Sequence, residues 1–343
     1  MPHPARPTVT LHDVAAAAGV SLSTASRVLG GSDRTVAPEY AERVLAAAAA
    51  LRYTADASAR AMRRASNSIA LVADDLTTVS IGLVLAAMER EARGVDAFVT
   101  VASTGGTPLR QLETVRLMCA LRPRALVLTS SRIDADVLGG RLLQELLDYQ
   151  RDGGRVVIFG DTDMPFDAFT VDNRAGAAKV GAYLADSGHR RVRILAGSPD
   201  RANVRARAVG FTDGLVAGGV DRADVHLVHC EVSREGGFEA VGRLLAAGRL
   251  DTEALACAND VIAIGAMSAL RAAGVRVPEQ LSVTGFDDIP LATDVTPRLT
   301  TVAIPLARIG RDAIRMALGE HGEPQRVTVR GELVVRDSTR PRG

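Results

Sequence analysis

The sequence of 343 residues is poor in aromatic side chains: it contains no tryptophan, and Phe, Trp and Tyr together make up 3% of it. A ligand site built on stacked aromatic rings is therefore not expected. Cysteine is also scarce, and Cys119, Cys230 and Cys257 lie far apart with no C-x-x-C pair. This spacing excludes a disulfide framework and a structural zinc cluster, so we expect no metal site and no cofactor.

Long hydrophobic runs are missing as well. No stretch approaches the roughly 18 apolar residues that a membrane-spanning helix needs. The first ten residues contain three prolines and no apolar segment of the kind found in secretory signals. We therefore expect a cytoplasmic protein with no membrane partner.

The sequence has enough apolar residues for two or three domains, because 47% of it is hydrophobic and 24% charged. Its net charge of +1 argues against a polycation that coats nucleic acid along its whole length. The charge is uneven, however. Residues 1–66 contain eight arginines and five acidic residues, whereas the remaining 277 residues have a net charge of −2. A basic N-terminal part suggests an anionic partner for that part.

From Thr10 to Arg52 the sequence has a helical pattern. Three helices are expected, each begun by a residue that suits a helix start: 11–18 after Thr10, 22–29 after Ser21, and about 38–51 from Pro38. Gly19 ends the first helix, because glycine adopts positive φ at little cost. A tight helix–Gly–helix turn is typical of the helix-turn-helix motif, whose second helix lies in the DNA major groove. Residues 55–66, small and basic, are interpreted as a linker that becomes helical when something stabilises it.

From residue 68 the pattern changes to short apolar runs that alternate with longer amphipathic ones. Strands are expected at 69–73, 98–102, 125–129, 156–160, 192–196, 225–228, 254–258 and 281–285. Helices are expected near 80–93, 108–121, 141–152, 174–187, 203–217, 235–247, 260–273 and 305–318. This alternation predicts doubly wound parallel sheets with ligands at the carboxyl ends of the strands. Because eight units exceed one usual sheet, we expect two α/β lobes with a cleft between them.

Polar residues follow several of the expected strands. They are Asp74-Asp75, Asp161, Asn259-Asp260 and Asp287-Asp288. Each alone could be a helix cap or an Asx turn. As a set, they favour a cleft in which several of them hydrogen-bond a small polar ligand.

Seven segments form a pattern that spans both parts of the chain: Val9–Ala15, Ala18–Ser21, Thr24–Leu29, Ser187–Arg190, Ala258–Asp260, Ser282–Asp288 and Pro297–Thr301. Over about residues 8–335, the sequence resembles the LacI/GalR family of bacterial transcription regulators. The resemblance implies a multidomain fold, with an all-α helix-turn-helix DNA-binding headpiece and a two-lobed α/β core like periplasmic sugar-binding proteins. Its parts would be a headpiece at 8–54, a hinge helix or linker at 55–66, and a core at 67–335. The first lobe would hold about 67–172 and 303–320, and the second about 173–302 and 321–335.

The resemblance also implies contacts to the bases of a palindromic operator. Leu22, Ser23 and Arg27 match recognition-helix positions that touch base edges, and an arginine there can donate two hydrogen bonds to guanine. Met62 matches the hinge leucine that wedges into the minor groove. No leucine heptad tail of the tetramer-forming members follows Val335, so a homodimer is expected.

Thr10, Ser21 and Ser26 match family positions that hold phosphates, although for Thr10 and Ser21 capping alone is the alternative. The third helix departs from the family pattern. Ala37 stands where the family usually has a Ser cap, and Tyr40-Ala41 replaces a Thr-Arg pair that usually contacts phosphate. Weaker DNA binding is a possible consequence.

For the effector, Arg207 matches the arginine of the family's cleft, and its planar fork suits vicinal hydroxyls or a carboxylate. Asn259, Asp287 and Asp161 are expected to bond ligand hydroxyls, so the resemblance implies a sugar or sugar derivative. Near Val232, where several members place an aromatic ring over the ligand, this chain has none, which leaves the effector's identity open.

The function expected from these features is that of a transcriptional repressor that binds double-stranded DNA as a dimer and responds to a small effector. Effector and operator would be linked, each changing the affinity for the other by the same free energy. The alternative is a cytosolic small-molecule-binding protein or enzyme on the same core with a weakened headpiece. The sequence has no Gly-rich phosphate loop and no G-x-S-x-G motif, so the enzyme hypothesis is disfavoured.

Overall fold

The computed structural model describes residues 9–30, 36–51, 53, 66–248, 250–319 and 322–342. It divides the chain into two compact units, an N-terminal one that ends at Ser66 and a larger one made of most of the remaining residues. The expected hinge helix, with Met62, lies outside the described residues.

The N-terminal unit consists of the helices α1 (Leu11–Ala18), α2 (Leu22–Gly30) and α3 (Pro38–Ala50). The predicted start of α1 is confirmed as a capping box, in which the Thr10 hydroxyl accepts from the Asp13 amide and the Asp13 carboxylate accepts from the Thr10 amide. Gly19 ends α1 with φ of 62°, as expected. Val14, Ala25 and Val44, one from each helix, are fully buried and form the centre of a small apolar core.

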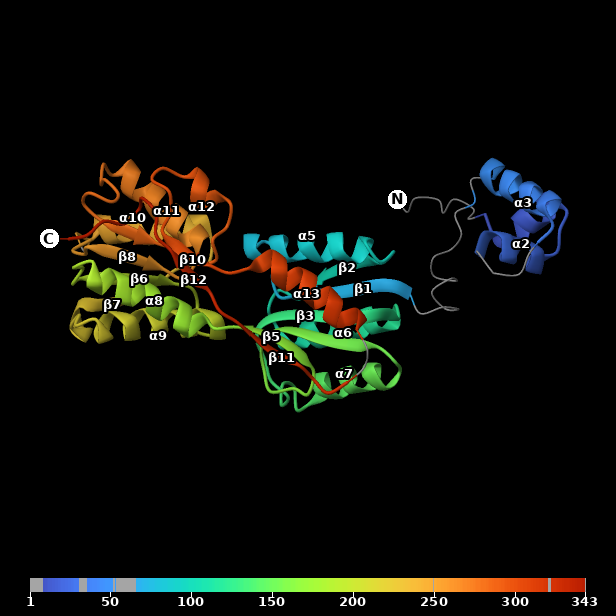
Figure 1. Cartoon of the computed structure of the whole chain (residues 1–343), viewed down its shortest axis with the longest axis horizontal. Helices are drawn as coiled ribbons and strands as arrows, with labels where there is room; N and C mark the ends of the chain where they lie inside the picture. The colour runs from blue at the N-terminus through green and yellow to red at the C-terminus, as the bar shows by residue number, and fades with distance from the viewer. Residues whose placement is uncertain are drawn as a thin grey trace, which may run out of the picture. The chain divides into compact units, whose positions relative to one another are not determined.

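The first lobe of the larger unit is a six-stranded sheet in the order β11-β5-β4-β3-β1-β2 (Figure 1). Its elements are β1 (Ser66–Ala73), α5 (Val79–Arg93), β2 (Phe98–Ser103), α6 (Pro108–Ala120), β3 (Pro123–Ile133), α7 (Arg141–Arg151), β4 (Arg155–Thr162), β5 (Asp167–Val171), α13 (Leu306–Leu318) and β11 (Arg326–Val329). The pairs β1–β2, β3–β4, β4–β5 and β5–β11 are parallel. Apolar runs such as Leu126-Val127-Leu128 form central strands because both faces of a parallel sheet are covered by helices.

The second lobe is built on a four-stranded parallel sheet in the order β7-β6-β8-β9. Its elements are α8 (Asn173–Asp186), β6 (Val192–Ala196), α9 (Ala202–Ala217), η1 (Arg222–Asp224), β7 (Val225–His229), α10 (Arg234–Ala246), β8 (Ala254–Cys257), α11 (Asp260–Ala272), β9 (Ser282–Thr284), α12 (Leu291–Asp294), β10 (Thr301–Ala303) and β12 (Glu332–Val334). Figure 1 shows α8 and α9 on one side of this sheet and α10 and α11 on the other. Glycine permits the close approach of α10 and α11, because a Cβ at Gly265 would collide with the Arg234 carbonyl oxygen.

The chain crosses between the lobes at three places: β5 to α8, β10 to α13, and β11 to β12. The crossings are hydrogen-bonded together, since the Asp172 amide donates to the Val329 carbonyl oxygen at 2.9 Å. The expectation that residues 321–335 lie in the second lobe is wrong for β11, which pairs with β5 of the first lobe. The four residues of β11 do not indicate which strand they pair with, so the sequence alone could not predict this crossing.

All eight strands and all eight core helices expected from the sequence are present, with ends that differ by a few residues at most. The strands β5, β10, β11 and β12 were not expected. None of the helices in the described part of the chain is long and apolar enough to cross a lipid bilayer.

Candidate functional site

The exposed face of α2 presents the side chains expected to contact bases. Leu22, Ser23 and Arg27 are exposed, while Ala25 on the opposite face is fully buried. The Arg27 side chain has no hydrogen-bond or ion-pair partner among the described residues, so its fork is available to an external acceptor. Ser23 and Arg27 are four residues apart, which places both side chains over one turn of the helix.

Thr10 and Ser21, expected at phosphates, lie at the N-termini of the two helices of the motif. The Ser21 hydroxyl accepts from the Thr24 amide at 3.1 Å and bonds the Ser23 hydroxyl at 2.8 Å. Ser26 is half-buried on α2. Both helix starts thus have side-chain caps, and capping can coexist with phosphate binding at a helix N-terminus.

The departure expected at the third helix is visible in the structure. Ala37 provides no side-chain cap for α3, and Tyr40 is exposed with the guanidinium of Arg43 over its ring. Arg43 also donates to the carbonyl oxygens of Ala18 and Gly19, which ties α3 to the turn between α1 and α2. Arg43 therefore stabilises the position of α2 within this unit.

In the larger unit, a cavity of about 390 Å³ lies between the two lobes. It is lined by residues at or near the carboxyl ends of β1, β3, β4, β5, β8 and β11, by the start of α9, and by Asp172 and Asn173 of the first crossing. In each sheet the strand order reverses beside the first strand of the lobe, β1 or β6, and such reversals open a crevice at the carboxyl ends. The predicted cleft is therefore where the topology requires it.

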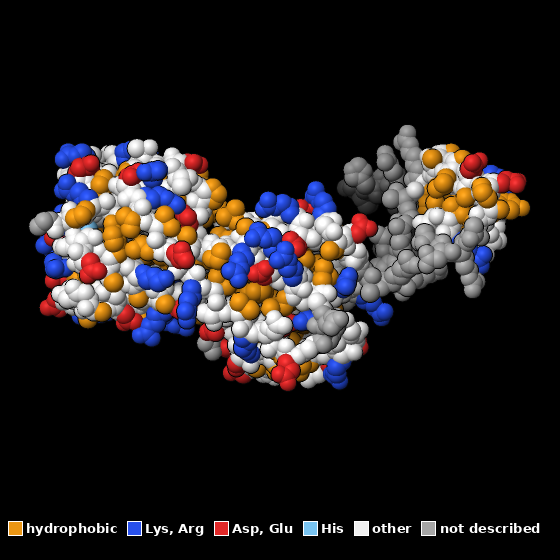
Figure 2. Space-filling view, viewed as in Figure 1, with side chains coloured by type: hydrophobic (Ala, Val, Ile, Leu, Met, Phe, Trp, Pro, Cys, Tyr) orange, Lys and Arg blue, Asp and Glu red, His pale blue; other side chains and the backbone are white. Residues whose placement is uncertain are grey.

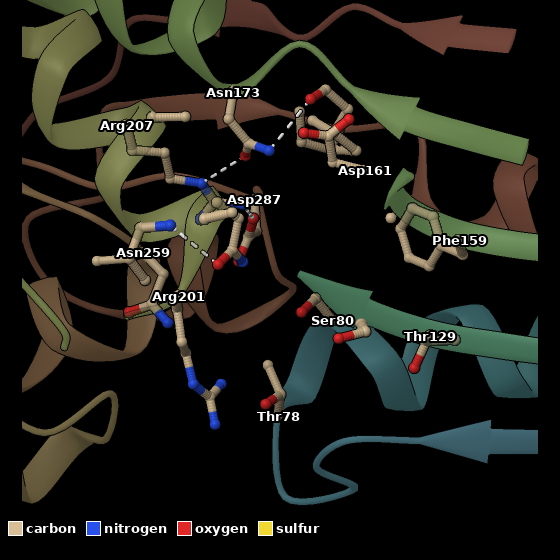
Figure 3. A pocket seen from close by; sticks show the side chains of 18 of the residues that line it. Thr78, Ser80, Thr129, Phe159, Asp161, Asn173, Arg201, Arg207, Asn259 and Asp287 are labelled. Carbon is tan, nitrogen blue, oxygen red and sulfur yellow. Dashed lines mark hydrogen bonds and ion pairs between the residues drawn. The ribbon is translucent and has the colours of Figure 1, made fainter. Parts of the chain in front are cut away.

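Arg207 lies at the centre of the second-lobe wall of this cleft (Figure 3). Its Nη2 is 2.9 Å from Asp287 Oδ1, its Nε donates to Asn173 Oδ1 at 2.7 Å, and its Nη1 donates to the Ala258 carbonyl oxygen at 2.6 Å. The guanidinium also stacks over Phe286, 3.8 Å from the ring centroid. Because arginine has five N–H donors, two remain for a ligand once these three contacts are made.

Asp287 and Asp260 differ in role although each follows a strand. Asp287 has φ of 107°, a conformation that a non-glycine residue rarely adopts, and it lines the cleft. Burial raises the pKa of Asp287 above its ordinary value, and the ion pair with Arg207 offsets only part of this rise. Asp260 faces away from the cleft and accepts from Thr301 Oγ1 at 2.5 Å and the Ile289 amide at 2.8 Å. Burial and the nearby Asp287 raise its pKa to about 8.

The two interpretations of the polar strand ends coexist at Asn259. Its side chain caps α11 by accepting from the Ile262 amide at 3.0 Å, and it also lines the cleft. Asp74, Asp75, Asp161 and Asp287 line the same cleft. Several of the polar residues thus line one cleft, as expected of the set, whereas Asp260 and Asp288 do not; Asp288 pairs with Arg336 at 2.7 Å.

The structure thus gathers Asp161, Arg207, Asn259 and Asp287 around one cavity. Other polar residues of the cleft were missed: Thr78, Ser80, Ser130, Asn173, Arg201 and Asn203. Ser130 and Asn173 lie within three residues of the ends of β3 and β5, whereas the other four lie five to seven residues beyond the ends of β1 and β6, around the starts of α5 and α9. A position after a strand end was the sequence signal for the cleft, but it separates cleft residues from other loop residues only once the strand order is known.

No metal is expected here. Within the described ranges, no three His, Cys, Asp or Glu side chains lie close enough together to hold a metal ion.

Comparison with known proteins shows which class of protein combines two such units in one chain. Residues 10–56 match the model of bacterial regulatory proteins of the lacI family, and residues 182–339 match that of the periplasmic binding protein-like domain. The HTH-type transcriptional regulator GalR of Escherichia coli is 31% identical over 90% of this chain and 88% of its own length. The fold and both sites therefore define a transcriptional regulator with a helix-turn-helix headpiece and a two-lobed ligand-binding core.

Solved structures agree. The Lac repressor dimer bound to operator and the anti-inducer ONPF superposes with a TM-score of 0.76 at 25% identity, covering 97% of this chain and 99% of the other. The regulator CelR in complex with cellobiose gives 0.67 at 27% identity over 97% and 100%. The chain belongs to the LacI family, and the relatives named above are transcriptional regulators. The sequence-based identification of the family is confirmed.

Proposed function

We propose that this chain is a repressor that binds a palindromic operator as a homodimer and is controlled by a sugar-like effector in the cleft. The observation that supports this most strongly is that one chain has both an exposed Arg27 on α2, with no partner among the described residues, and a polar cavity around Arg207. The protein would act at its DNA in the cytoplasm, associated with the nucleoid.

Operator recognition is the first claim to test. Purified full-length protein and the Arg27→Ala variant are used to select fragments of the source genome at about 150 mM salt. The wild type should enrich a palindrome, and Arg27→Ala should lose it, because one bidentate arginine–guanine contact contributes about 1–3 kcal/mol of discrimination. Arg90→Ala in the core, whose side chain bonds the Ala86 carbonyl oxygen, is the matched control and should select the same palindrome. Equal enrichment by all three proteins would contradict the role given to Arg27.

The chemistry of the cleft supports a neutral polyol as the effector. Arg207 donates, Asp287 and Asp161 accept, and Asn259 can do both, which matches groups that each donate and accept, as hydroxyls do. The relative CelR was solved with cellobiose. A panel of mono- and disaccharides should include one that raises the melting temperature of wild type but not of Asp161→Ala. A rise of equal size in both proteins would place the ligand elsewhere.

The homodimer has support on the surface of the first lobe. β2 is an edge strand that exposes Phe98 and Val101, and the neighbouring segment of α6 exposes Leu117, with Leu121 beyond its end. An edge strand with apolar side chains invites pairing with another chain. In Figure 2, basic, acidic and hydrophobic side chains are interspersed over the visible face of the core. Burial of β2 and α6 against a second copy would remove this exposed apolar surface from water.

A further inference from the structure

The three arginines that line the cleft differ in their contacts with the described part of the chain. Arg174 pairs with an aspartate of α9 at 2.7 Å, and Arg207 pairs with Asp287 at 2.9 Å, all within the second lobe. The side chain of Arg201, in contrast, makes no hydrogen bond or ion pair with any described residue. Figure 3 shows it extending from the start of α9 toward Thr78 on the first-lobe wall.

A fixed carboxylate of the first lobe lines the same cleft, near enough to Arg201 for the two charges to interact. Asp75 follows β1, and its Oδ1 accepts from the Thr77 amide at 2.8 Å and from the Thr77 hydroxyl at 2.7 Å. The pKa of Asp75 is lowered: partial burial raises it, but the bonds from Thr77 and the charge of Arg201 outweigh burial. Asp75 is therefore ionised and interacts with Arg201 across the cleft, although the two form no ion pair in this structure.

We propose that Asp75 and Arg201 form an ion pair that holds the two lobes together when the cleft closes. Figure 3 places Arg201 and Thr78 at the end of the cleft away from Asn173, which begins α8 beside the crossings. The crossings join the lobes at one end, and the pair joins them at the other. An effector that projects between Asp75 and Arg201 keeps them apart, so the pair also limits the length of the effector.

The effect of the pair follows from its exposure. Ion pairs at partly exposed sites are weak, so we expect this one to change the ratio of closed to open molecules by about 2- to 5-fold. The consequence for DNA affinity rests on the proposed function, but closure itself does not.

Hydrogen–deuterium exchange of the full-length protein tests the pair without DNA or effector. The first amides of α5 and α9, on opposite walls of the cleft, have no acceptor within their helices, so their exchange reports closure. Arg201→Gln should speed exchange about 2- to 5-fold in the first-lobe peptide 74–82, and Asp75→Asn should do the same in the second-lobe peptide 198–206. The double reversal Asp75→Arg/Arg201→Asp should restore slow exchange.

The lobe in which exchange changes distinguishes an ion pair between the lobes from a role of Asp75 or Arg201 within its own lobe only. Such a role would change exchange only in the lobe that holds the substitution. Arg205→Gln, in the first turn of α9 but outside the cleft, should leave the peptide 74–82 unchanged, because the Arg205 side chain donates to the nearby Pro199 carbonyl oxygen. The proposal is overturned if neither single variant affects the opposite lobe, or if the double reversal exchanges as fast as the single variants. Failure of the wild type to bind any operator would contradict the proposed function alone.

Discussion

Replacement of Arg207 by methionine tests how the second-lobe wall of the cleft is stabilised. The side chains of Arg207 and Asp287 are only 11% and 9% exposed, and their contact is 2.9 Å. Methionine preserves much of the apolar contact with Phe286 but removes the ion pair and the hydrogen bonds to Asn173 and Ala258. Loss of one partner from a buried pair leaves an uncompensated charge, so we expect the core to lose about 3–5 kcal/mol at pH 7.

The assay is urea unfolding of the full-length protein followed by far-UV circular dichroism. Arg174→Met is the matched control, because its pair with Asp213 is 65% and 43% exposed and should contribute at most about 1 kcal/mol. In Arg207→Met the folded-state pKa of Asp287 lies above its unfolded value, so the penalty is present at pH 7. It should shrink as the pH falls and Asp287 takes up a proton.

Adding Asp287→Asn should recover part of the loss, because it removes the stranded charge. A loss below about 1 kcal/mol for Arg207→Met, or no recovery in the double variant, would refute the view that each charge of the buried pair is strongly stabilised by the other.

Three further outcomes are expected. The folded-state pKa of Asp260, about 8, lies above its unfolded value, so the core should lose stability as the pH rises from about 4 to 8; Asp260→Asn should lessen this slope in thermal melts, and an unchanged slope would show that Asp260 titrates normally. Thr10→Ala should destabilise the N-terminal unit by about 1 kcal/mol through loss of the α1 cap. The assay is the melting transition of the N-terminal unit, with Thr8→Ala as the control. Equal stability of the two variants would refute the role of the cap. Val101→Arg on β2 should yield a monomer in sedimentation velocity, whereas the exposed Val216→Arg on α9 should not; a dimer of Val101→Arg would move the interface elsewhere.

The elements that the sequence predicted are those whose patterns are local. Each of the eight expected strands is a short run of apolar residues, and Thr10, Gly19 and Pro38 mark the helix ends by their own backbone preferences. The missed strand β5 begins with Asp167, whose carboxylate pairs with the buried Arg155 at 2.9 Å. That pairing holds a charged residue in a central sheet, and nothing local to residues 167–171 reveals it.

The cleft could be predicted in outline for a different reason. Parallel strands bring their carboxyl ends to one edge, so polar residues after strands converge without any knowledge of their partners. The sequence could not show in which direction each side chain points. Asn259 lines the cleft, whereas the next residue, Asp260, accepts a hydrogen bond from Thr301 of β10. Arg201 was missed because its direction depends on where α9 begins.

Reciprocal linkage tests the central claim most directly, namely that the cleft and the headpiece of this chain act on one another. Operator affinity is measured with and without the saccharide found by the melting screen, and saccharide affinity is measured with and without operator. The account predicts the same factor in both directions, about 5- to 150-fold, because the coupling is a single free energy. Tight binding of both ligands with no change in either affinity would contradict it.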